Sequence, residues 1–301
     1  MMRVFRVARA APVAVTLVLV VACGDRSAGG GGSGDAVVAS KVTLRYHPPA
    51  GAVHRYTLDQ LNKMSMVEGP LAGMGEQNLT LKMRFTQSVT GAVAGGIEVR
   101  VTLDSTHMEA PGVSPEMMVR ELDRLRGLVS TVLLDERAQV VRSTTGAAPG
   151  VAPELASQVS TNVKAIAFPL PEQPVGQGDS WTVMTDLPMA QLAGASGAGS
   201  ARTTRTVREI RVAQGDTSVV LAVETTFPRD PITLRIGGQP ATLKLSGGQS
   251  GEQVFSLTRG VVVSGTMKGT MRMNVTGGPV GPKGMVLSSA TETTLRLIDA
   301  P

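Results

Sequence analysis

Leu79-Thr80-Leu81-Lys82-Met83-Arg84-Phe85-Thr86 alternates apolar and polar side chains without an exception. Successive side chains of a β-strand point to opposite faces, so this period of two predicts a strand with one buried and one solvated face. Ile97–Leu103 repeats the pattern after the glycine-containing turn Gly91–Gly96. Two such segments joined by a turn are typical of an antiparallel hairpin. The sequence therefore predicts a mainly β protein.

Further strand patterns lie on both sides of this hairpin. They are Val42–Tyr46, His54–Met66, Thr131–Leu134, Gln139–Arg142, Arg202–Val212, Thr217–Phe227, Ile232–Ile236, Ala241–Leu245, Gln253–Leu257, Val261–Val275 and Val286–Ile298. Gly265 and Gly269 interrupt the apolar face of the longest of them. Glycine on a buried strand face indicates a bend or a close approach of two backbones. We therefore expect a large curved antiparallel sheet or half-barrel.

Two segments have the pattern of a helix. Ser114-Pro115-Glu116 combines a capping hydroxyl with proline at the first helical position, which is typical of a helix start. Apolar residues then recur at spacings of three and four between Met118 and Val129, and a similar pattern runs from Pro153 to Ala165. We expect two or three helices to cover the sheet, which makes the fold class mainly β (α+β).

A proline-rich crossover divides the chain. Phe168–Pro174 contains three prolines, which exclude a helix and favour extended backbone. It separates an N-terminal β-rich half with helices, residues 41–167, from a C-terminal antiparallel β half, residues 168–301. The alternative is one continuous domain. Trp181, the only tryptophan, follows the crossover and is expected to pack in the core at the start of a strand.

Residues 1–22 have the pattern of an export signal. Arg3, Arg6 and Arg9 precede an apolar run of about a dozen residues, which is too short for the roughly 20 residues of a spanning helix. Leu17–Cys23 closes the run and resembles the bacterial lipobox. By that resemblance Cys23 becomes an acylated mature N-terminus. The alternative is an ordinary secretory signal with a chance cysteine.

The lipobox resemblance implies a location. Acyl chains such as palmitate on Cys23 would anchor the protein stably in a membrane. Residues 23–40 are rich in glycine and predict a flexible tether between this anchor and the folded part. The expected location is the bacterial cell envelope after export, and the outer membrane where the organism has one.

A second resemblance concerns the crossover. Pro169-Leu170-Pro171 with Val175-Gly176-Gln177-Gly178-Asp179-Ser180-Trp181, together with the later stretch Gly251–Ser264, resembles uncharacterised β-rich bacterial surface lipoproteins with a GDSW-type centre. This resemblance implies an envelope lipoprotein and supplies no catalytic residue. The curved sheet with covering helices also resembles half-barrel lipoprotein carriers, which hold acyl chains on the concave face. That second likeness is architectural, and a fold does not fix a function.

The composition argues against several function classes. The net charge of +5 depends on the signal, because removing its three arginines from the 29 basic residues leaves 26 against 24 acidic residues. The electrostatic basis for nucleic-acid binding is thus weak. Cys23 is the only cysteine, and the three histidines have no ligand-spaced neighbours. We found no nucleophile elbow and no phosphate-binding loop, so we expect no enzyme activity, catalytic residue, cofactor or metal.

The methionine content suggests a ligand. The chain contains 15 methionines, 5 phenylalanines and 2 tyrosines, and methionine fills irregular cores or lines adaptable apolar surfaces. We expect an apolar ligand or lipid to bind in a concavity of the sheet that is lined by Met267, Met271 and Met273. The alternative function is a structural or protein-interaction module of the envelope, with a filled interior and an envelope protein as partner.

Overall fold

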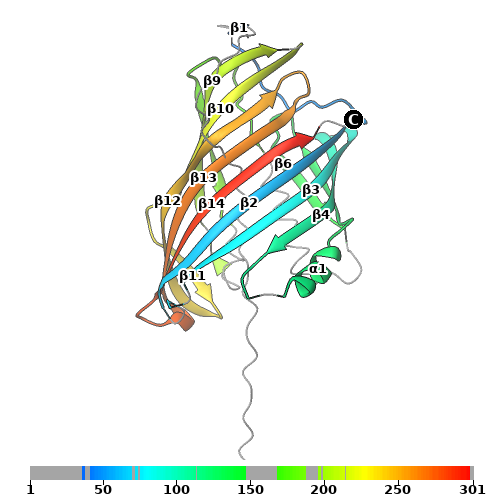
Figure 1. The fold of residues 1–301 in the computed structure, drawn as a ribbon. Coiled ribbons are helices and arrows are strands. Elements are labelled where there is room, and N and C mark those ends of the chain that lie inside the picture. Colours follow the sequence, from blue (N-terminus) through cyan, green and yellow to red (C-terminus); the bar gives the residue numbers. More distant parts are fainter. Residues whose placement is uncertain are drawn as a thin grey trace, which may run out of the picture.

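The computed structural model contains one large antiparallel sheet. It describes residues 36–37, 41–69, 72–73, 75–112, 114–146, 168–187, 196–197, 199–213 and 215–298. The sheet has 14 strands and is strongly curled, with long tilted strands side by side in its wall (Figure 1). The predicted export signal, Cys23 and the second predicted helix, 153–165, lie outside the described residues.

The strands are long in the middle of the sheet and short at its ends. Their bounds are β1 (Ala36–Val37), β2 (Val53–Glu68), β3 (Glu76–Val93), β4 (Gly96–Glu109), β5 (Val129–Leu134), β6 (Val140–Thr145), β7 (Ser180–Asp186), β8 (Ser196–Gly197), β9 (Ser200–Ala213), β10 (Asp216–Thr226), β11 (Ile232–Ile236), β12 (Gln239–Ser256), β13 (Val261–Gly277) and β14 (Met285–Ile298). The order in space is β1-β9-β10-β12-β13-β14-β2-β3-β4-β5-β6. In addition, β7 pairs with β9, and β11 pairs with β12 and β8.

The hairpins predicted from sequence are confirmed. β3 pairs with β4 so that Phe85 lies opposite Leu103, and β5 pairs with β6 around the predicted turn. The last strand, β14, pairs with β2, which places Thr293 opposite Gln60. The strands of residues 41–167 and 168–301 therefore belong to one sheet.

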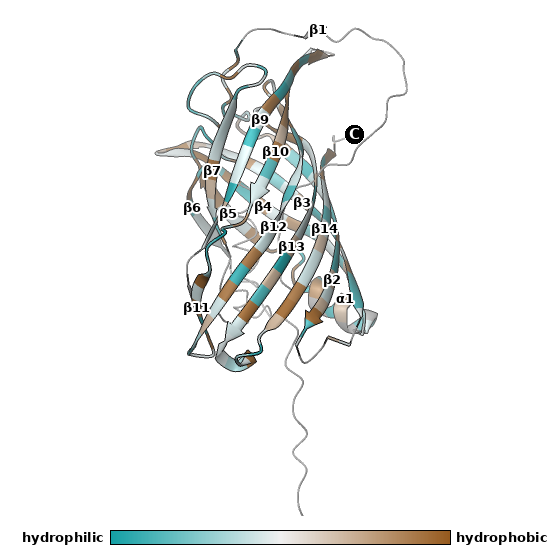
Figure 2. Ribbon diagram, turned by 90° about the vertical axis from the view of Figure 1, so that its left-hand side faces the viewer, coloured by the Kyte–Doolittle hydropathy of each residue, from teal (hydrophilic) through white to brown (hydrophobic). Residues whose placement is uncertain are grey.

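Alternation along the strands separates an inner, concave face from an outer, solvated one. Leu79, Leu81 and Phe85 of β3 are buried, whereas Lys82 and Arg84 are exposed. Bands of apolar and polar residues accordingly alternate along the strands in Figure 2. An antiparallel sheet with one dry and one wet face satisfies its backbone hydrogen bonds internally and buries apolar side chains on one side only.

The inner face holds two large apolar clusters and a small one formed by Val223 and Met267. The larger, which we call the aromatic compartment, is built around Tyr46, Tyr56, Phe85, Phe168 and Phe255. The second large cluster, which we call the methionine compartment, consists of Ile232, Leu234, Ala241, Leu243, Leu245, Met273 and Val275, with Met271 and Leu287 packed against it. Strands β11 to β14 supply all of these side chains of the methionine compartment.

Glycines allow the inner face of β12 and β13 to accept long side chains. Gln249 lies opposite Gly269, and a Cβ at Gly269 would lie 2.1 Å from Cγ of Gln249 and 2.7 Å from the carbonyl oxygen of Gly248. The register repeats this arrangement, with Gly265 opposite Gln253 and Gly251 opposite Met267. The expected strands Ala241–Leu245 and Gln253–Leu257 are consequently parts of the single strand β12, which continues through its glycines.

The expectation of two or three covering helices is wrong for the described residues. They contain one α-helix, α1 (Pro115–Asp123), and a short 3₁₀ turn, η2 (Gly278–Val280). The apolar stripe extends past the helix, because α1 ends at Asp123 and the buried Leu125 follows it in a turn. Val119 and Arg120 of α1 are exposed, Leu122 packs against the core, and the helix lies beside the end of β4 (Figure 1).

Two irregular segments cover the inner face of the aromatic compartment. They are Val42–Pro49 and Phe168–Gly178, and we call the two segments together the plug. The predicted strand Val42–Tyr46 is wrong, since only Val42 forms a bridge, with Val175. Leu44 and Leu170 of the plug are completely buried, and Trp181 packs against the same cluster at the start of β7 as expected.

Candidate functional site: a cavity on the inner face

A cavity of about 80 Å³ lies in the aromatic compartment. It is lined by Tyr46, Tyr56, Phe85, Gln87, Val99, Val101, Val132, Leu134, Ala138, Phe168, Gln253, Phe255, Val261, Val262 and Leu295. All but two of these side chains, Gln87 and Gln253, are apolar or aromatic. Such a lining with few polar groups is typical of sites for small apolar ligands. For scale, an engineered apolar cavity that binds benzene measures about 150 Å³, so a longer ligand needs side chains to move aside.

The plug joins the two ends of the curled sheet over this cavity. The amide of Leu170 donates to the carbonyl oxygen of Arg137 in the β5–β6 turn at 2.8 Å. At the other end of the segment, the amide of Gly178 donates to the carbonyl oxygen of Val207 on β9, also at 2.8 Å. Phe168–Gly178 thus spans from one end of the sheet to the other.

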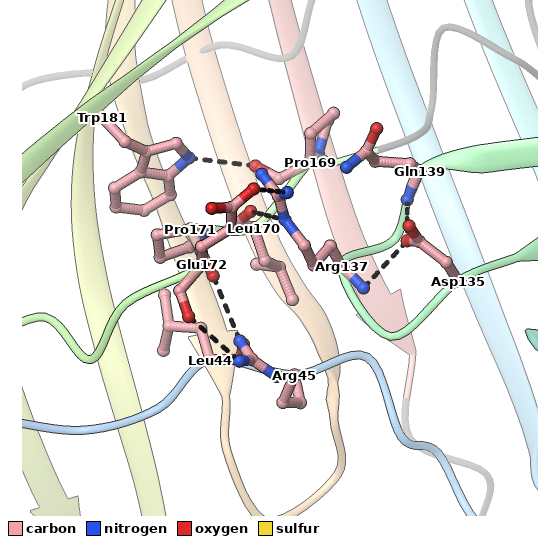
Figure 3. A network of polar contacts seen from close by, with 10 residues as sticks. All are labelled: Leu44, Arg45, Asp135, Arg137, Gln139, Pro169, Leu170, Pro171, Glu172 and Trp181. Carbon is pink, nitrogen blue, oxygen red and sulfur yellow. Dashed lines mark hydrogen bonds and ion pairs between the residues drawn. The ribbon is translucent and has the colours of Figure 1, made fainter.

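Two arginines hold the plug segment Phe168–Gly178 from its solvent side, Arg137 of the β5–β6 turn and Arg45 of the other plug segment (Figure 3). Arg137 donates from Nε to the carbonyl oxygen of Leu170 at 3.1 Å and forms an ion pair with Glu172. Arg45 donates to the carbonyl oxygens of Pro171 at 3.1 Å and Glu172 at 3.0 Å. These bonds satisfy carbonyl groups of a segment whose prolines remove it from any sheet ladder.

The aromatic rings of the cavity make specific contacts. Tyr56 and Phe85 stack with a centroid distance of 5.2 Å, and Phe168 stacks on Phe255 at 6.3 Å. The Tyr56 hydroxyl donates to the carbonyl oxygen of Val262 at 2.9 Å. Burial raises the pKa values of Tyr46 and Tyr56 far above the ordinary range of a tyrosine, so both phenols stay neutral at physiological pH.

Arg205 is a buried cation beside the cavity. Its residue is 7% exposed, and its guanidinium carbon lies 4.4 Å from the centroid of the Phe168 ring. Burial lowers the pKa of Arg205 to about 10, which leaves the group charged at neutral pH. A cation over an aromatic face gains roughly 2 kcal/mol when both groups are desolvated. An unpaired buried charge costs several kcal/mol, so this contact offsets only part of the penalty.

Other polar atoms on the inner face also lack partners. Within the described part of the chain, no hydrogen bond reaches Nε or Nη1 of Arg205, Oε1 of Gln249, Oε1 of Gln253 or Oγ1 of Thr293. All four residues are buried. Most buried polar groups in folded proteins are hydrogen-bonded. Of these four residues, Gln253 lines the cavity, and the guanidinium of Arg205 lies against Phe168, which also lines it.

The three predicted ligand-binding methionines do not lie around the cavity. Met267 packs with Val223, in the same cross-strand row as Arg205, whereas Met273 and Met271 belong to the methionine compartment. The residues that the sequence analysis missed are Phe168, Phe255, Arg205 and Gln253. The strand pattern around Arg205 gave one usable signal, because Arg205 occupies an inward position of β9 between Thr203 and Val207.

The described residues contain neither a candidate metal site nor a membrane-spanning helix. No cluster of three or more His, Cys, Asp or Glu side chains is placed to hold a metal ion in the described ranges. Among those residues there is also no helix with the length and apolarity required to cross a membrane.

Comparison with known proteins assigns the chain to no family. No protein-family profile matches the chain, and no curated protein matches it. A solved structure of lipovitellin, from work on lipid–protein interactions in that protein, is similar with a TM-score of 0.47 and 12% sequence identity. The alignment covers 85% of this chain and 26% of lipovitellin, so the chain spans about a quarter of that protein. A likeness this weak carries no functional argument, and the proposals below depend on the cavity itself.

Proposed function

We propose that the protein binds the apolar chain of a lipid or similar amphiphile inside the curled sheet, without catalysing a reaction. The observation that supports this proposal is the cavity of about 80 Å³ with its aromatic and aliphatic lining. Burying apolar surface there supplies the binding free energy, at roughly 25 cal/mol for each Å² removed from water.

Binding of a chain requires the cavity to enlarge at the plug. The cavity is bordered on one side by Phe168, which comes from the plug and not from a sheet strand. Irregular segments open at lower free energy than paired strands. We therefore assign the plug the role of a lid that lies over the apolar chain after entry.

The location proposed with this function is a membrane of the bacterial cell envelope, with Cys23 as the acylated anchor. The lipobox-like stretch Leu17–Cys23 and the glycine-rich residues 24–34 support this part of the proposal. A protein tethered in this way would hold its cavity next to the source of its ligand. Mass spectrometry of the exported protein tests it, since acylation of Cys23 adds the mass of the acyl chains and a Cys23→Ser variant does not.

The binding proposal is tested with 1-dodecanol, an uncharged chain. We expect the wild-type protein to bind it in a titration that follows the fluorescence of Trp181, which packs against the cavity cluster. Val132→Phe, which fills the cavity from β5, should weaken binding at least tenfold. Val141→Phe on the neighbouring strand is the matched control, because Val141 is 56% exposed. Equal binding by wild type and Val132→Phe, or no binding by wild type, would contradict the proposal.

A second candidate function is a protein-interaction module that uses the edge of the sheet. In the described ranges, β6 pairs with β5 on one side and forms the end of the strand order. Its exposed Val141 lies on this edge strand. Unprotected edge strands favour pairing with another chain. Under this alternative, Val141→Lys would abolish the capture of a partner and dodecanol would not bind.

A further inference from the structure

We propose that Arg205 binds the carboxylate of a single-chain amphiphile, such as a fatty acid, whose apolar chain lies in the aromatic compartment. This inference names the ligand class and rests on the proposed function above. It follows from three properties of Arg205: its position, its lack of partners and its connection to the cavity.

Position is the first property. Arg205 lies on β9 and faces inward, opposite Val223 of β10 on one side and Trp181 of β7 on the other. Its neighbours on the same face of the strand are Thr203 and Val207. None of these side chains carries a charge, so the sheet itself gives the guanidinium no counterion.

Lack of partners is the second property. Nε and Nη1 are fully covered and meet no acceptor from the described residues. No carboxylate of those residues lies within ion-pair distance of the guanidinium, although ion pairs are frequent on the outer face, as between Lys268 and Glu292 at 3.0 Å. Buried arginines are normally paired, because their charge is costly to desolvate. An anion from outside the chain would supply the missing partner.

Connection to the cavity is the third property. Phe168 covers the guanidinium at 4.4 Å and also lines the cavity, so a single ring separates the cation from the apolar space. Phe168 belongs to the plug, which must move for a chain to enter. Displacing Phe168 would exchange its cation–π contact for a charge-assisted hydrogen bond from the guanidinium to a carboxylate.

The polar side chains available to a ligand in the cavity favour one small anionic head. Gln253, which is 6% exposed, lines the cavity, and its amide can be turned to present its N–H₂ group to an anion. Arg205 and Gln253 together provide one positive charge and one neutral amide donor. One carboxylate matches this set better than a doubly charged phosphate.

The test compares two ligands with the same chain and different heads. Dodecanoate and 1-dodecanol are titrated into the wild-type protein and into Arg205→Met, with Trp181 fluorescence and calorimetry as readouts. We expect dodecanoate to bind wild type more tightly than dodecanol, and Arg205→Met to lose at least tenfold in dodecanoate affinity with dodecanol affinity unchanged. Arg205→Lys, which keeps the charge, should recover part of the loss. Arg208→Met, on the same strand with a side chain that is 64% exposed, is the control and should behave as wild type.

Each contrary result has one meaning. The inference would be overturned by an equal loss of affinity for dodecanoate and dodecanol in Arg205→Met, with no such loss in Arg205→Lys and an unchanged melting temperature. In that case the residue would only shape the apolar site. Unchanged dodecanoate binding in Arg205→Met would overturn it too. Stronger binding of a lysophospholipid phosphate than of dodecanoate would overturn the carboxylate assignment. Failure of wild type to bind dodecanol would contradict the proposed function, which is a separate outcome.

Discussion

The aromatic and methionine compartments are built on the same sheet by different means. Strands β11 to β14, which are neighbours in sequence, supply the methionine compartment, and its buried side chains are aliphatic or methionine. The aromatic compartment needs segments that are far apart in sequence, since Leu44, Phe168 and Phe255 meet there. It also contains the cavity and lies next to the unpartnered Arg205 and Gln253. Local hairpins thus supply the side chains of the methionine compartment, whereas the long-range plug borders the cavity of the aromatic compartment.

The two compartments also differ in how the backbone of their buried residues is hydrogen-bonded. Leu243 of the methionine compartment and Leu170 of the plug are both completely buried. The backbone of Leu243 is held in the β12 ladder opposite Val275, whereas that of Leu170 is held by the Arg137 carbonyl and side chain. A plug fastened to the sheet by a few isolated backbone and side-chain hydrogen bonds can open without breaking a strand pair. Four predictions test this difference, beginning with the largest expected effect.

Leu170→Ala and Leu243→Ala should destabilise the protein by similar amounts, about 2–5 kcal/mol each, because both remove a fully buried side chain. Their effects on ligand binding should differ. Leu170→Ala loosens the plug and should change dodecanol affinity at least fivefold, while Leu243→Ala should leave it unchanged. Urea unfolding measures the stability and Trp181 fluorescence the affinity. A large affinity change in Leu243→Ala would show that the compartments are not independent.

Gly269→Ala should destabilise the sheet between the two compartments by about 1–3 kcal/mol, the range for overpacking. The added methyl group would meet Gln249 at 2.1 Å and the backbone oxygen of Gly248 at 2.7 Å. Gln249→Ala in the same chain should recover part of the loss, since the contact with Cγ at 2.1 Å disappears, while the contacts with Cβ of residue 249 at 2.8 Å and with the backbone oxygen of Gly248 stay. Gly73→Ala is the control, because a Cβ there meets nothing within 4 Å. Equal unfolding midpoints for Gly269→Ala and Gly73→Ala would refute the argument from close packing.

Arg137→Met should weaken the fastening of the plug by about 1–2 kcal/mol, because it removes the bonds to Leu170 and Glu172. The substitution should promote opening of the plug more than global unfolding of the sheet. Hydrogen exchange at the amides of Leu170 and Gly178 should accelerate more than exchange in β12. Arg208→Met removes an outer-face arginine that lies 3.9 Å from Glu252, and it should change stability by less than about 0.5 kcal/mol. Uniform acceleration across the sheet would mean that the plug does not open on its own.

Sequence patterns predicted the sheet better than they predicted the site. Period-two alternation identified β2, β3, β4, β9, β10, β13 and β14, because burial alternates along most of each strand. The exception is the irregularity in β10, where Val219, Val220 and Leu221 are all buried. The same reasoning placed a strand at Val42–Tyr46, where apolar alternation comes from packing of the plug and not from a ladder. It also divided β12 at glycines that serve close packing. Local periodicity does not report whether a segment has a hydrogen-bonding neighbour.

Local sequence patterns could not predict the cavity either, because its residues come together only in the tertiary structure. Met267, Met271 and Met273 share the inner face of β13, as predicted, but the sheet register distributes them away from the cavity. Phe168 and Phe255 are 87 residues apart in the sequence, and only the closed plug brings their rings to 6.3 Å. The inward position of Arg205 on its strand can be seen in the sequence pattern. Its contact with the Phe168 ring and its unpartnered nitrogens can be seen only in the tertiary structure. Contacts of this kind depend on tertiary structure alone.

Tyr56→Phe should give the smallest effect and a distinct dependence on pH. The loss of the hydrogen bond to Val262 should cost about 1 kcal/mol at pH 8. Burial raises the pKa of Tyr56, so the unfolded chain loses its phenolic proton near pH 10 while the folded chain keeps it. The stability contributed by this group is therefore complete below about pH 10 and falls as the pH rises further, by roughly 1.4 kcal/mol at pH 11.

Tyr56→Phe should lose less stability than wild type between pH 8 and pH 11 in urea unfolding. Tyr46 shares the raised pKa, so the double variant should be the least sensitive to alkali. An identical alkaline loss in all three proteins would mean that the aromatic compartment admits solvent freely, and the contrast with the methionine compartment would then fail.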